Sequence, residues 1–435
     1  MEFTTQHEQQ HQGRQPGEAE ARTQNWSGTY AYRAQRILTP ASIDELQETV
    51  AAEGSIRALG TRHSFNDVAD GPGVLVTTTA IAPDVAVAAD RLSVTVGSGT
   101  RYAVLAEALE QEGLALHNMG SLPHISVGGA TATGTHGSGT ALGSLSTAVS
   151  GLDLVGADGS IRRLTRADPE FAGSVVALGA LGVVSRVTLD VQPHYRVRQD
   201  VYAHLPWRAL EGDGLRAVMA AGYSVSLFTV YGADVAQVWV KTRIPEGEAD
   251  APVPDDLFGA RRVPERPDRG GPDDNTTPMD GSVGPWSTRL PHFRIDRTPS
   301  SGDEIQTEYF VSIDDGAAAL AEVRKLADRI QPHLLVTELR AVAADSLWLG
   351  ETQGRDSLCI HFTWKNHPHE IGELLPDIEA ALRPFDARPH WGKVARFETF
   401  DLAALYPRLG DFRRLVAAHD PGGKFRGPFL DRVLL

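Results

Sequence analysis

The chain has 435 residues, of which 41 are Lys or Arg and 56 are Asp or Glu, so its net charge at pH 7 is −15. This length exceeds what one hydrophobic core organises, so we expect at least two domains. The acidic balance disfavours nucleic acid or an anionic membrane surface as a partner. With one cysteine, Cys359, the sequence offers no internal disulfide, and we expect a reducing, cytoplasmic location.

The N-terminal residues 1–24 are polar and lack the apolar run of a signal peptide, so we expect a disordered tail. No run of about 18 apolar residues follows, so the sequence predicts no membrane span. Ser42 followed by Glu45 matches a capping box and predicts a helix from Ile43. The pattern then predicts strands at 56–60, 74–76, 85–87 and 92–96, and a helix at 102–112.

The pattern of strands continues beyond residue 140. Two strands, 149–155 and 161–164, are predicted around the turn Ala157-Asp-Gly159. A strand at 187–191 completes a first α+β domain, which ends near Pro193.

A second domain follows, with a helix at 316–330 and strands at 334–342 and 358–365. Residues 245–285 are rich in Pro, Asp, Gly and Arg, and we expect a surface insertion there, because a loop of this length is uncommon within a compact domain.

The stretch Gly120–Gly139, GSLPHISVGGATATGTHGSG, has the composition of a phosphate-binding loop. Glycine lets the chain turn tightly and leaves backbone N–H groups open to an anion. A glycine turn in a β protein or a flexible linker has a similar composition. The interleaved His124, Ile125 and His136 argue against a linker.

Several motifs in order resemble one family. Residues 60–66, GTRHSFN, and residues 118–139 together resemble the flavin-binding domain of the vanillyl-alcohol oxidase family, and within it the alditol oxidases most. The similarity extends through Glu338-Leu-Arg340, His361-Phe-Thr-Trp364 and Arg388-Pro-His-Trp-Gly-Lys393, and covers nearly everything from Asn25 onward.

The resemblance implies an α+β, two-domain flavoprotein of the vanillyl-alcohol-oxidase type. Residues 25–194 would form an FAD-binding domain of the PCMH type. Residues 195–385 would form a substrate-binding cap domain, an antiparallel sheet flanked by helices, which contains the 245–285 insertion. Residues 386–435 would return to the active site and the FAD domain.

The resemblance also implies that the FAD pyrophosphate lies in the two glycine segments and that His63 bonds covalently to the flavin 8α-methyl group. From the residues alone, a turn histidine is the simpler interpretation of His63. Some relatives carry glycine where Arg62 stands, which changes the packing at that edge. The implied cofactor-binding residues are His63, Gly60, Thr61, Arg62, Ser64, Ser121, Ser126, Val127, Gly128, Gly129, Thr133, Gly134, Thr135, His136, Gly137, Gly182 and Val183.

The second-domain motifs suit the oxidation of an alcohol, which needs a polar cluster beside the flavin. Glu338 and Arg340 are two apart on a predicted strand and share one face. The alternative for such a pair is an ordinary cross-strand ion pair, and for Lys393 an exposed lysine. By analogy with the family, the residues expected to bind and activate the substrate are Lys393, Arg340, Glu338, Thr363 and Ser121. We expect no metal.

Two further positions are less specific. His361 shares a face with Thr363 and suits either proton handling or a core position. Gly120 lies where relatives carry a small residue near the flavin, and a missing side chain there would leave room for oxygen.

Three functions compete. The first is an FAD-dependent alditol oxidase that converts xylitol or sorbitol to the aldose and O2 to H2O2. The second is an aldonolactone oxidase or dehydrogenase with the same flavin domain. The third is a nucleotide-binding protein without turnover, which would not need Glu338, Arg340 and Lys393. A nicotinamide dehydrogenase is disfavoured because no G-x-G-x-x-G opens a helix after a strand. We expect a monomer whose partners are a small polyol and O2.

Overall fold

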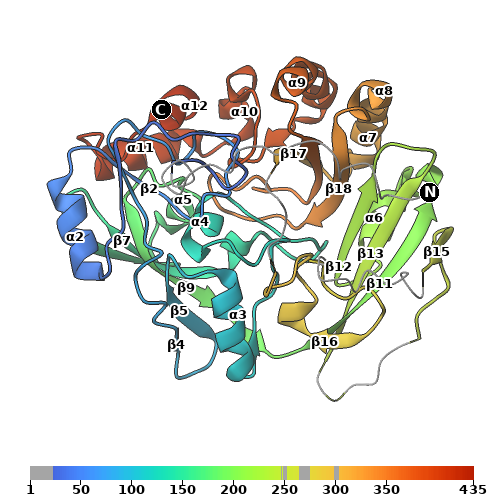
Figure 1. Ribbon diagram of the computed structural model, residues 1–435, viewed down its shortest axis with the longest axis horizontal. Helices are drawn as coiled ribbons and strands as arrows, with labels where there is room; N and C mark the ends of the chain where they lie inside the picture. Colours follow the sequence, from blue (N-terminus) through green and yellow to red (C-terminus); the bar gives the residue numbers. More distant parts are fainter. Residues whose placement is uncertain (1–22, 246, 248–251, 264–274, 298–302) are drawn as a thin grey trace, which may run out of the picture.

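The computed structural model describes residues 23–245, 247, 252–263, 275–297 and 303–435. Apart from Thr23 and Gln24, the predicted disordered tail lies outside the described residues, and so does part of the 245–285 insertion. Figure 1 shows small sheets and helices on one side of the molecule and a large sheet on the other, with the C-terminal helices along one edge.

Three small sheets organise the first domain. A parallel sheet has the order β1-β3-β2, an antiparallel sheet has the order β4-β5-β9-β7-β8, and β6 pairs with β10. The strands are β1 (Arg36–Leu38), β2 (Ile56–Ala58), β3 (Val74–Val76), β4 (Ala86–Val87), β5 (Ser93–Gly97), β6 (Leu114–Ala115), β7 (Val149–Val155), β8 (Ile161–Thr165), β9 (Val183–Asp190) and β10 (Gln192–Pro193).

The N-cap predicted at Ser42 is present at the start of α2 (Ile43–Ala52), but the capping box is shifted, because the Glu45 side chain binds the residue before the cap. The Glu45 N–H donates to Ser42 Oγ at 3.1 Å, and Glu45 Oε2 accepts from the Ala41 N–H at 2.8 Å. The helix buries Leu46 and Val50, as its apolar spacing predicts. The predicted hairpin is also present, because β7 and β8 pair antiparallel around Gly159, whose φ of +83° suits glycine.

A ten-stranded sheet forms the second domain, in the order β14-β15-β11-β13-β12-β18-β19-β17-β20, with β16 also paired to β11. Its strands are β11 (Arg196–Leu205), β12 (Ser224–Thr229), β13 (Val235–Ile244), β14 (Asp256–Leu257), β15 (Ala260–Arg262), β16 (Val283–Pro285), β17 (Glu304–Ser312), β18 (Leu334–Val342), β19 (Ser357–Lys365) and β20 (Arg388–Pro389). The described part of the insertion is therefore not a plain loop, since it contributes the short strands β14, β15 and β16 to the sheet.

The helices cover these sheets. They are α3 (Tyr102–Gln111), α4 (Val127–Ala132), α5 (Phe171–Ser174), α6 (Gly214–Met219), α7 (Gly316–Arg324), α8 (Ala327–Ile330), α9 (Pro368–Leu382), α10 (Leu402–Leu405), α11 (Leu409–His419) and α12 (Pro428–Val433). Single 3₁₀ turns lie at η1 (Leu145–Ala148), η2 (Trp207–Leu210), η3 (Trp286–Thr288), η4 (Arg383–Phe385) and η5 (Phe397–Thr399).

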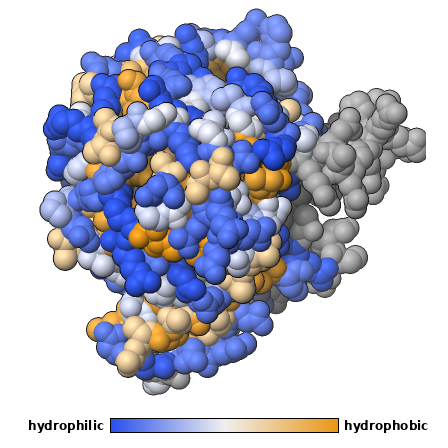
Figure 2. Space-filling view, turned by 90° about the vertical axis from the view of Figure 1, so that its left-hand side faces the viewer, coloured by the Kyte–Doolittle hydropathy of each residue, from blue (hydrophilic) through white to orange (hydrophobic). Residues whose placement is uncertain are grey.

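Two large apolar cores match the two domains. Side chains from α6, α7 and α9 pack with the large sheet, whereas those from α3, β7 and β9 pack with α10, α11 and α12 from the end of the chain. On the face shown in Figure 2, apolar residues form separate patches among hydrophilic ones. The C-terminal helices thus contribute to the core of the first domain.

The predicted helix at 316–330 is wrong in its continuity, because the structure divides it into α7 and α8. The N–H groups of Lys325 and Leu326 bond three residues back, to Glu322 and Val323, and this tight turn ends the first helix. The glycine-rich stretch 120–139 also differs from a plain loop, because α4 forms within it.

Candidate active site

A cavity of about 480 Å³ lies where the two domains meet. One side, the first-domain wall, is formed mainly by residues from the segments 57–65, 121–136 and 174–184, although not every residue of these segments lines the cavity. The other side, the sheet wall, consists of side chains from β12, β13, β17, β18 and β19 together with 390–393 and part of the 276–293 segment. The cavity therefore joins both motif sets found in the sequence.

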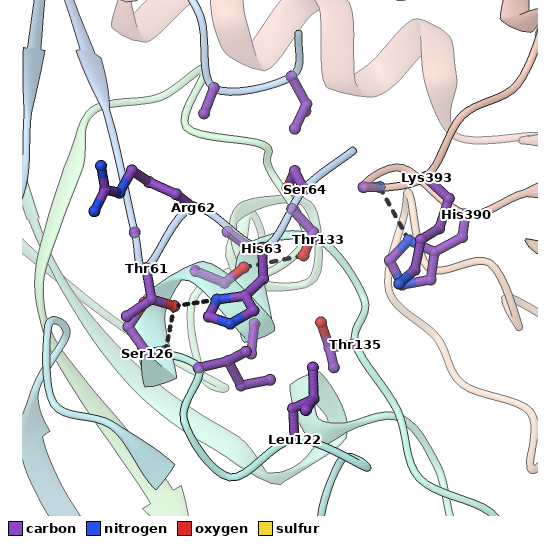
Figure 3. A pocket seen from close by; sticks show the side chains of 18 of the residues that line it. Thr61, Arg62, His63, Ser64, Leu122, Ser126, Thr133, Thr135, His390 and Lys393 are labelled. Carbon is purple, nitrogen blue, oxygen red and sulfur yellow. Dashed lines mark hydrogen bonds between the residues drawn. The ribbon is translucent and has the colours of Figure 1, made fainter. Parts of the chain in front are cut away.

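Close backbone approach shapes the first-domain wall. Gly60 and Gly129 face one another, and a Cβ on Gly60 would lie 2.8 Å from Ser126 Oγ and 3.4 Å from the Gly129 Cα. Any larger side chain would push these two segments apart. Thr61 Oγ1 ties them together by accepting the Ser126 N–H at 3.1 Å (Figure 3).

His63 is held rigidly in this wall. Its ring stacks on Trp26 with centroids 5.2 Å apart, and its Nδ1 lies 3.1 Å from Thr61 Oγ1. Burial, followed by the charge of Lys393, lowers the pKa of His63 to about 3, so the imidazole is neutral at physiological pH. Figure 3 shows Arg62 pointing away from this ring.

Arg62 has a φ of +65°, a left-handed conformation that costs a residue with a Cβ roughly 1 kcal/mol. A glycine would adopt this conformation freely, which explains why glycine suits the position. The arginine keeps the turn and carries its side chain away from His63.

Unpartnered polar atoms line this wall. Among the described residues, none is a hydrogen-bond partner for the buried His63 Nε2 or the buried Ser126 Oγ. Buried polar groups are normally hydrogen-bonded, so two orphans beside a glycine cradle fit a wall built against a bound molecule. The residues present therefore fit a cofactor with a phosphate group and a planar ring.

Most of the predicted cofactor residues line the cavity. The members of the set that do so are Gly60, Thr61, Arg62, His63, Ser64, Ser121, Ser126, Gly128, Gly129, Thr133, Thr135, His136, Gly182 and Val183.

Three predicted cofactor residues lie outside the lining: Val127, Gly134 and Gly137. Val127 is fully buried in the first core. A Cβ on Gly134 would lie 2.0 Å from Glu351 Oε2, and one on Gly137 would lie 2.4 Å from Asn118 Oδ1. At these two positions the absence of a side chain makes room for Glu351 and Asn118.

A row of charged side chains crosses three adjacent strands of the sheet wall. Glu308 on β17 is opposite His361 on β19, and His361 is opposite Glu338 on β18. Cross-strand neighbours on one face lie within contact distance. His361 Nδ1 is accordingly 3.2 Å from Glu308 Oε1.

Arg340 joins the two carboxylates of this row. Its Nη2 donates to Glu308 Oε1 at 2.5 Å, and its Nε lies 3.7 Å from Glu338 Oε1. Burial alone would raise the pKa of Glu338, but Arg340 and then His292 outweigh it and hold the pKa at about 2. Burial likewise opposes ionisation of Glu308, yet His361 and Arg340 keep its pKa well below the usual value. Both carboxylates are therefore anionic at neutral pH.

A neutral polar row lies beside the charged one. Thr363 is opposite Gln306 on β17, and Thr363 Oγ1 is 3.2 Å from His361 Nε2. Lys393 Nζ donates to Gln306 Oε1 and lies 5.0 Å above the Phe65 ring. Desolvation in the cavity lowers the pKa of Lys393. All five predicted catalytic residues, Ser121 included, line the cavity.

His390 lies at the end of the cavity near Lys393 (Figure 3). The Gly392 N–H donates to His390 Nδ1 at 2.9 Å, which places the imidazole proton on Nε2, 4.0 Å from Glu308 Oε2. Burial lowers the pKa of His390 well below its usual value.

Sequence reasoning missed several residues of this site. Glu308 is the most connected of them, with Gln306 two positions away on the same face of β17. The alternation Glu304, Gln306, Glu308 was the available signal, because polar residues at every second position mark one face of a strand. Other missed lining residues include Phe228, Trp239, His292 and His390.

The comparisons with known proteins agree with this geometry. Residues 34–165 match the family described as FAD binding domain, and residues 301–433 match D-arabinono-1,4-lactone oxidase. An alditol oxidase from a Streptomyces species is 44% identical over 414 residues, which are 94% of this chain and 98% of that protein. The chain belongs to the vanillyl-alcohol oxidase family of flavoproteins.

Other relatives and a solved structure support the same architecture. L-gulono-1,4-lactone dehydrogenase of Mycobacterium tuberculosis is 28% identical over 429 residues, covering 94% of this chain and 98% of that one. Cholesterol oxidase from B. sterolicum superposes with a TM-score of 0.74 at 17% identity, covering 95% of this chain and 96% of that one. The predicted fold, a PCMH-type FAD-binding domain with an antiparallel cap domain, is confirmed.

None of the helices in the described ranges combines the length and the apolar character that crossing a membrane requires.

Proposed function

We propose that this chain is an FAD-dependent alditol oxidase, which oxidises the terminal carbinol of an open-chain polyol such as xylitol or sorbitol and reduces O2 to H2O2. The observation that carries the proposal is the charged row of the sheet wall, which faces the glycine cradle across one cavity. The 44% identical alditol oxidase supports the substrate class.

Bound FAD supplies the hydride acceptor, its N5 atom. The chain's own residues hold the polyol. Glu338 is anionic at neutral pH and accepts hydrogen bonds from hydroxyl groups, while the hydroxyls of Thr363 and Ser121 both donate and accept.

Two cations meet the reacting end of the substrate. The Arg340 guanidinium and the Lys393 ammonium line the same cavity, and positive groups that are fixed in place stabilise the negative charge that develops on oxygen as the C–H bond breaks. Desolvation lowers the pKa of Lys393, so a larger fraction of it is neutral than of an exposed lysine, and its neutral Nζ can accept the hydroxyl proton and become the ammonium beside the oxygen.

His63 would be the covalent anchor of the flavin. An imidazole must be neutral to act as a nucleophile, and burial keeps His63 neutral. Trp26 and Thr61 Oγ1 hold the ring at the cavity wall, and within the described residues Nε2 has no protein partner and is left for the flavin. The remaining lining residues of the first-domain wall would hold the pyrophosphate and the adenine end.

Oxygen would reach the reduced flavin past Gly120. A Cβ at Gly120 would meet Thr135 Cγ2 at 3.5 Å and Ile125 Cδ1 at 3.7 Å, so the absent side chain leaves a methyl-sized space between two apolar groups. We also expect a cytoplasmic monomer, whose oligomeric state light scattering would measure.

The deciding experiment measures peroxide released in air by the purified holoenzyme, with xylitol, sorbitol, mannitol and L-gulono-1,4-lactone in parallel, and repeats the assay with an artificial electron acceptor. Peroxide with the polyols alone is the expected result. The match of 301–433 to D-arabinono-1,4-lactone oxidase makes a lactone the second candidate. Turnover of the lactone alone, or turnover only with the artificial acceptor, would overturn the proposal.

The covalent bond has its own test. After denaturation and gel filtration, the yellow colour should remain with the wild-type chain and separate from His63→Ala. His124→Ala is the matched control, because it removes another histidine near this wall and should retain the colour. Release of the flavin from the wild type would refute the anchor.

A further inference from the structure

A buried lysine outside the cavity lining bears on how the substrate residues are held. Lys241 lies on β13 with 1% of its surface exposed. In the described part of the chain no carboxylate forms an ion pair with it, and its Nζ donates to the backbone carbonyls of Leu290 and Pro291. Burial lowers the pKa of Lys241 to about 7, with Glu338 opposing the shift. A buried cation is costly, so its placement needs a reason.

The carbonyls that Lys241 binds belong to a short strap, residues 290–293. On its other side, the N–H groups of His292 and Phe293 both donate to the Ser121 carbonyl, at 3.2 and 3.1 Å. The strap thus connects β13 of the cap domain to the Ser121 loop of the FAD domain. Ser121 is one of the residues that the proposed function assigns to the substrate.

The strap also brings a side chain to the sheet wall. His292 Nδ1 lies 3.5 Å from Glu338 Oε1, and its ring packs edge-on against Trp239 and Phe228, at 5.0 and 5.6 Å between centroids. Burial, followed by Lys241, lowers the pKa of His292 to about 3. One segment therefore contacts both a first-domain substrate residue and a sheet-wall substrate residue.

A second anchor holds the strap without a charge. Thr277 Oγ1 donates to the Pro291 carbonyl at 2.8 Å, and the Thr277 N–H donates to the His292 carbonyl at 2.9 Å. Thr277 lies in the insertion, so the insertion and β13 fix the same four residues from two directions.

We propose that Lys241 is a positioning residue for the substrate site: by holding the strap 290–293 it sets the distance between Ser121 and Glu338, and so the fit of the polyol chain between the two domains. The inference rests on the proposed function for the identity of the substrate. It also gives the 245–285 insertion a role, through Thr277.

The test compares Lys241→Met with Thr277→Val and with the control Lys365→Met. Lys365 also donates to a backbone carbonyl, that of Pro332, but on the surface and far along the sequence from the strap. For xylitol we expect KM to rise about tenfold in Lys241→Met and about threefold in Thr277→Val, with kcat within about threefold, because a loss of binding shared by ground state and transition state appears in KM. The control should match the wild type.

Amide hydrogen exchange of the strap supplies a readout that needs no substrate. The His292 and Phe293 amides should exchange at least about tenfold faster in Lys241→Met than in the wild type, while the amides of β13 exchange at the wild-type rate. If the wild type does not turn over xylitol, the proposed function fails, but exchange still tests the strap. If Lys241→Met does not fold, Thr277→Val decides both measurements.

Unchanged strap exchange in both variants would overturn the inference. A fall in kcat with KM unchanged would also overturn it, because Lys241 would then act on the reacting atoms or on overall stability and not on the fit of the substrate.

Discussion

The two walls of the cavity consist of different kinds of chemical group. The first-domain wall uses glycines, short hydroxyl side chains and a neutral histidine, so it presents mostly backbone and makes close approaches. The sheet wall uses two carboxylates, a guanidinium and a histidine on adjacent strands, together with His292 and His390 from segments outside the strands. The first wall suits a cofactor that binds once and stays, whereas the second wall suits a small polar substrate that exchanges in every cycle.

The difference predicts how each wall fails. A substitution in the first-domain wall should act sterically, because a single added Cβ forces two chain segments apart. A substitution in the sheet wall should act electrostatically, because a buried charge that loses its counter-ion is costly. Mutations in the two walls should therefore change different observables: cofactor content in one and turnover in the other.

The largest effect is expected in the charged wall. Arg340→Met leaves the carboxylates of Glu308 and Glu338 buried without their shared cation and should lower kcat/KM about 10³-fold, or roughly 4 kcal/mol, while FAD content stays at the wild-type level. Arg329→Met, which breaks only an exposed ion pair with Asp377, is the control and should change kcat/KM less than about twofold.

The same variant has a pH signature. In the wild type the pKa of Glu338 is about 2, and Arg340 is the largest influence that lowers it. Without that cation, burial raises the pKa, so Glu338 takes up a proton as the pH falls and kcat/KM should decline on the acid side of neutrality. The wild-type profile should show no such decline from Glu338 above about pH 4. Identical acid limbs would refute the assigned pairing.

Gly60→Ala should have a smaller effect, and the effect should be on FAD content and not on turnover. The new Cβ would meet Ser126 Oγ at 2.8 Å and should reduce FAD content on purification by about tenfold. The double variant Gly60→Ala with Ser126→Ala removes that contact and should recover part of the FAD. Gly372→Ala on α9, where a Cβ meets nothing within 4 Å, is the control. Full FAD content in Gly60→Ala would contradict the steric account.

The first-domain wall could be predicted from the sequence because its determinants are contiguous. Residues 60–64 and 126–129 each form a short segment whose glycine spacing is visible in the chain. The sequence could not distinguish a glycine that faces the cavity from a glycine that faces other parts of the protein. Gly134 and Gly137 lie in the same glycine-rich stretch as Gly129, but Glu351 and Asn118 approach them closely, and Gly134 also has a φ of +70°.

The sheet wall was half predictable. Glu338 and Arg340 share a strand, so a spacing of two placed them on one face. Glu308 lies on β17, 53 positions before His361 in the sequence. The two side chains meet only because the register of β17 and β19 places them opposite one another. Register of this kind follows from tertiary pairing and leaves little trace in local pattern. The strap residue His292 was missed because it lies outside the strands, in a segment whose contact with Glu338 arises only from the fold.

The smallest effect is expected at Gly120, past which we propose that oxygen reaches the flavin. An alanine Cβ would make ordinary contacts of 3.5 Å with Thr135 and 3.7 Å with Ile125, so Gly120→Ala should fold and bind FAD as the wild type does. If oxygen passes through the space that the methyl group fills, the rate of reoxidation by O2 should fall by about three- to tenfold. Reduction by xylitol, and turnover with an artificial acceptor that takes electrons at the flavin edge, should change less than about twofold. Stopped-flow measurement of the two half-reactions separates these rates.

Slowing of both half-reactions alike would mean that the methyl group disturbs the flavin itself. An unchanged reoxidation rate would place the route for oxygen elsewhere in the cavity.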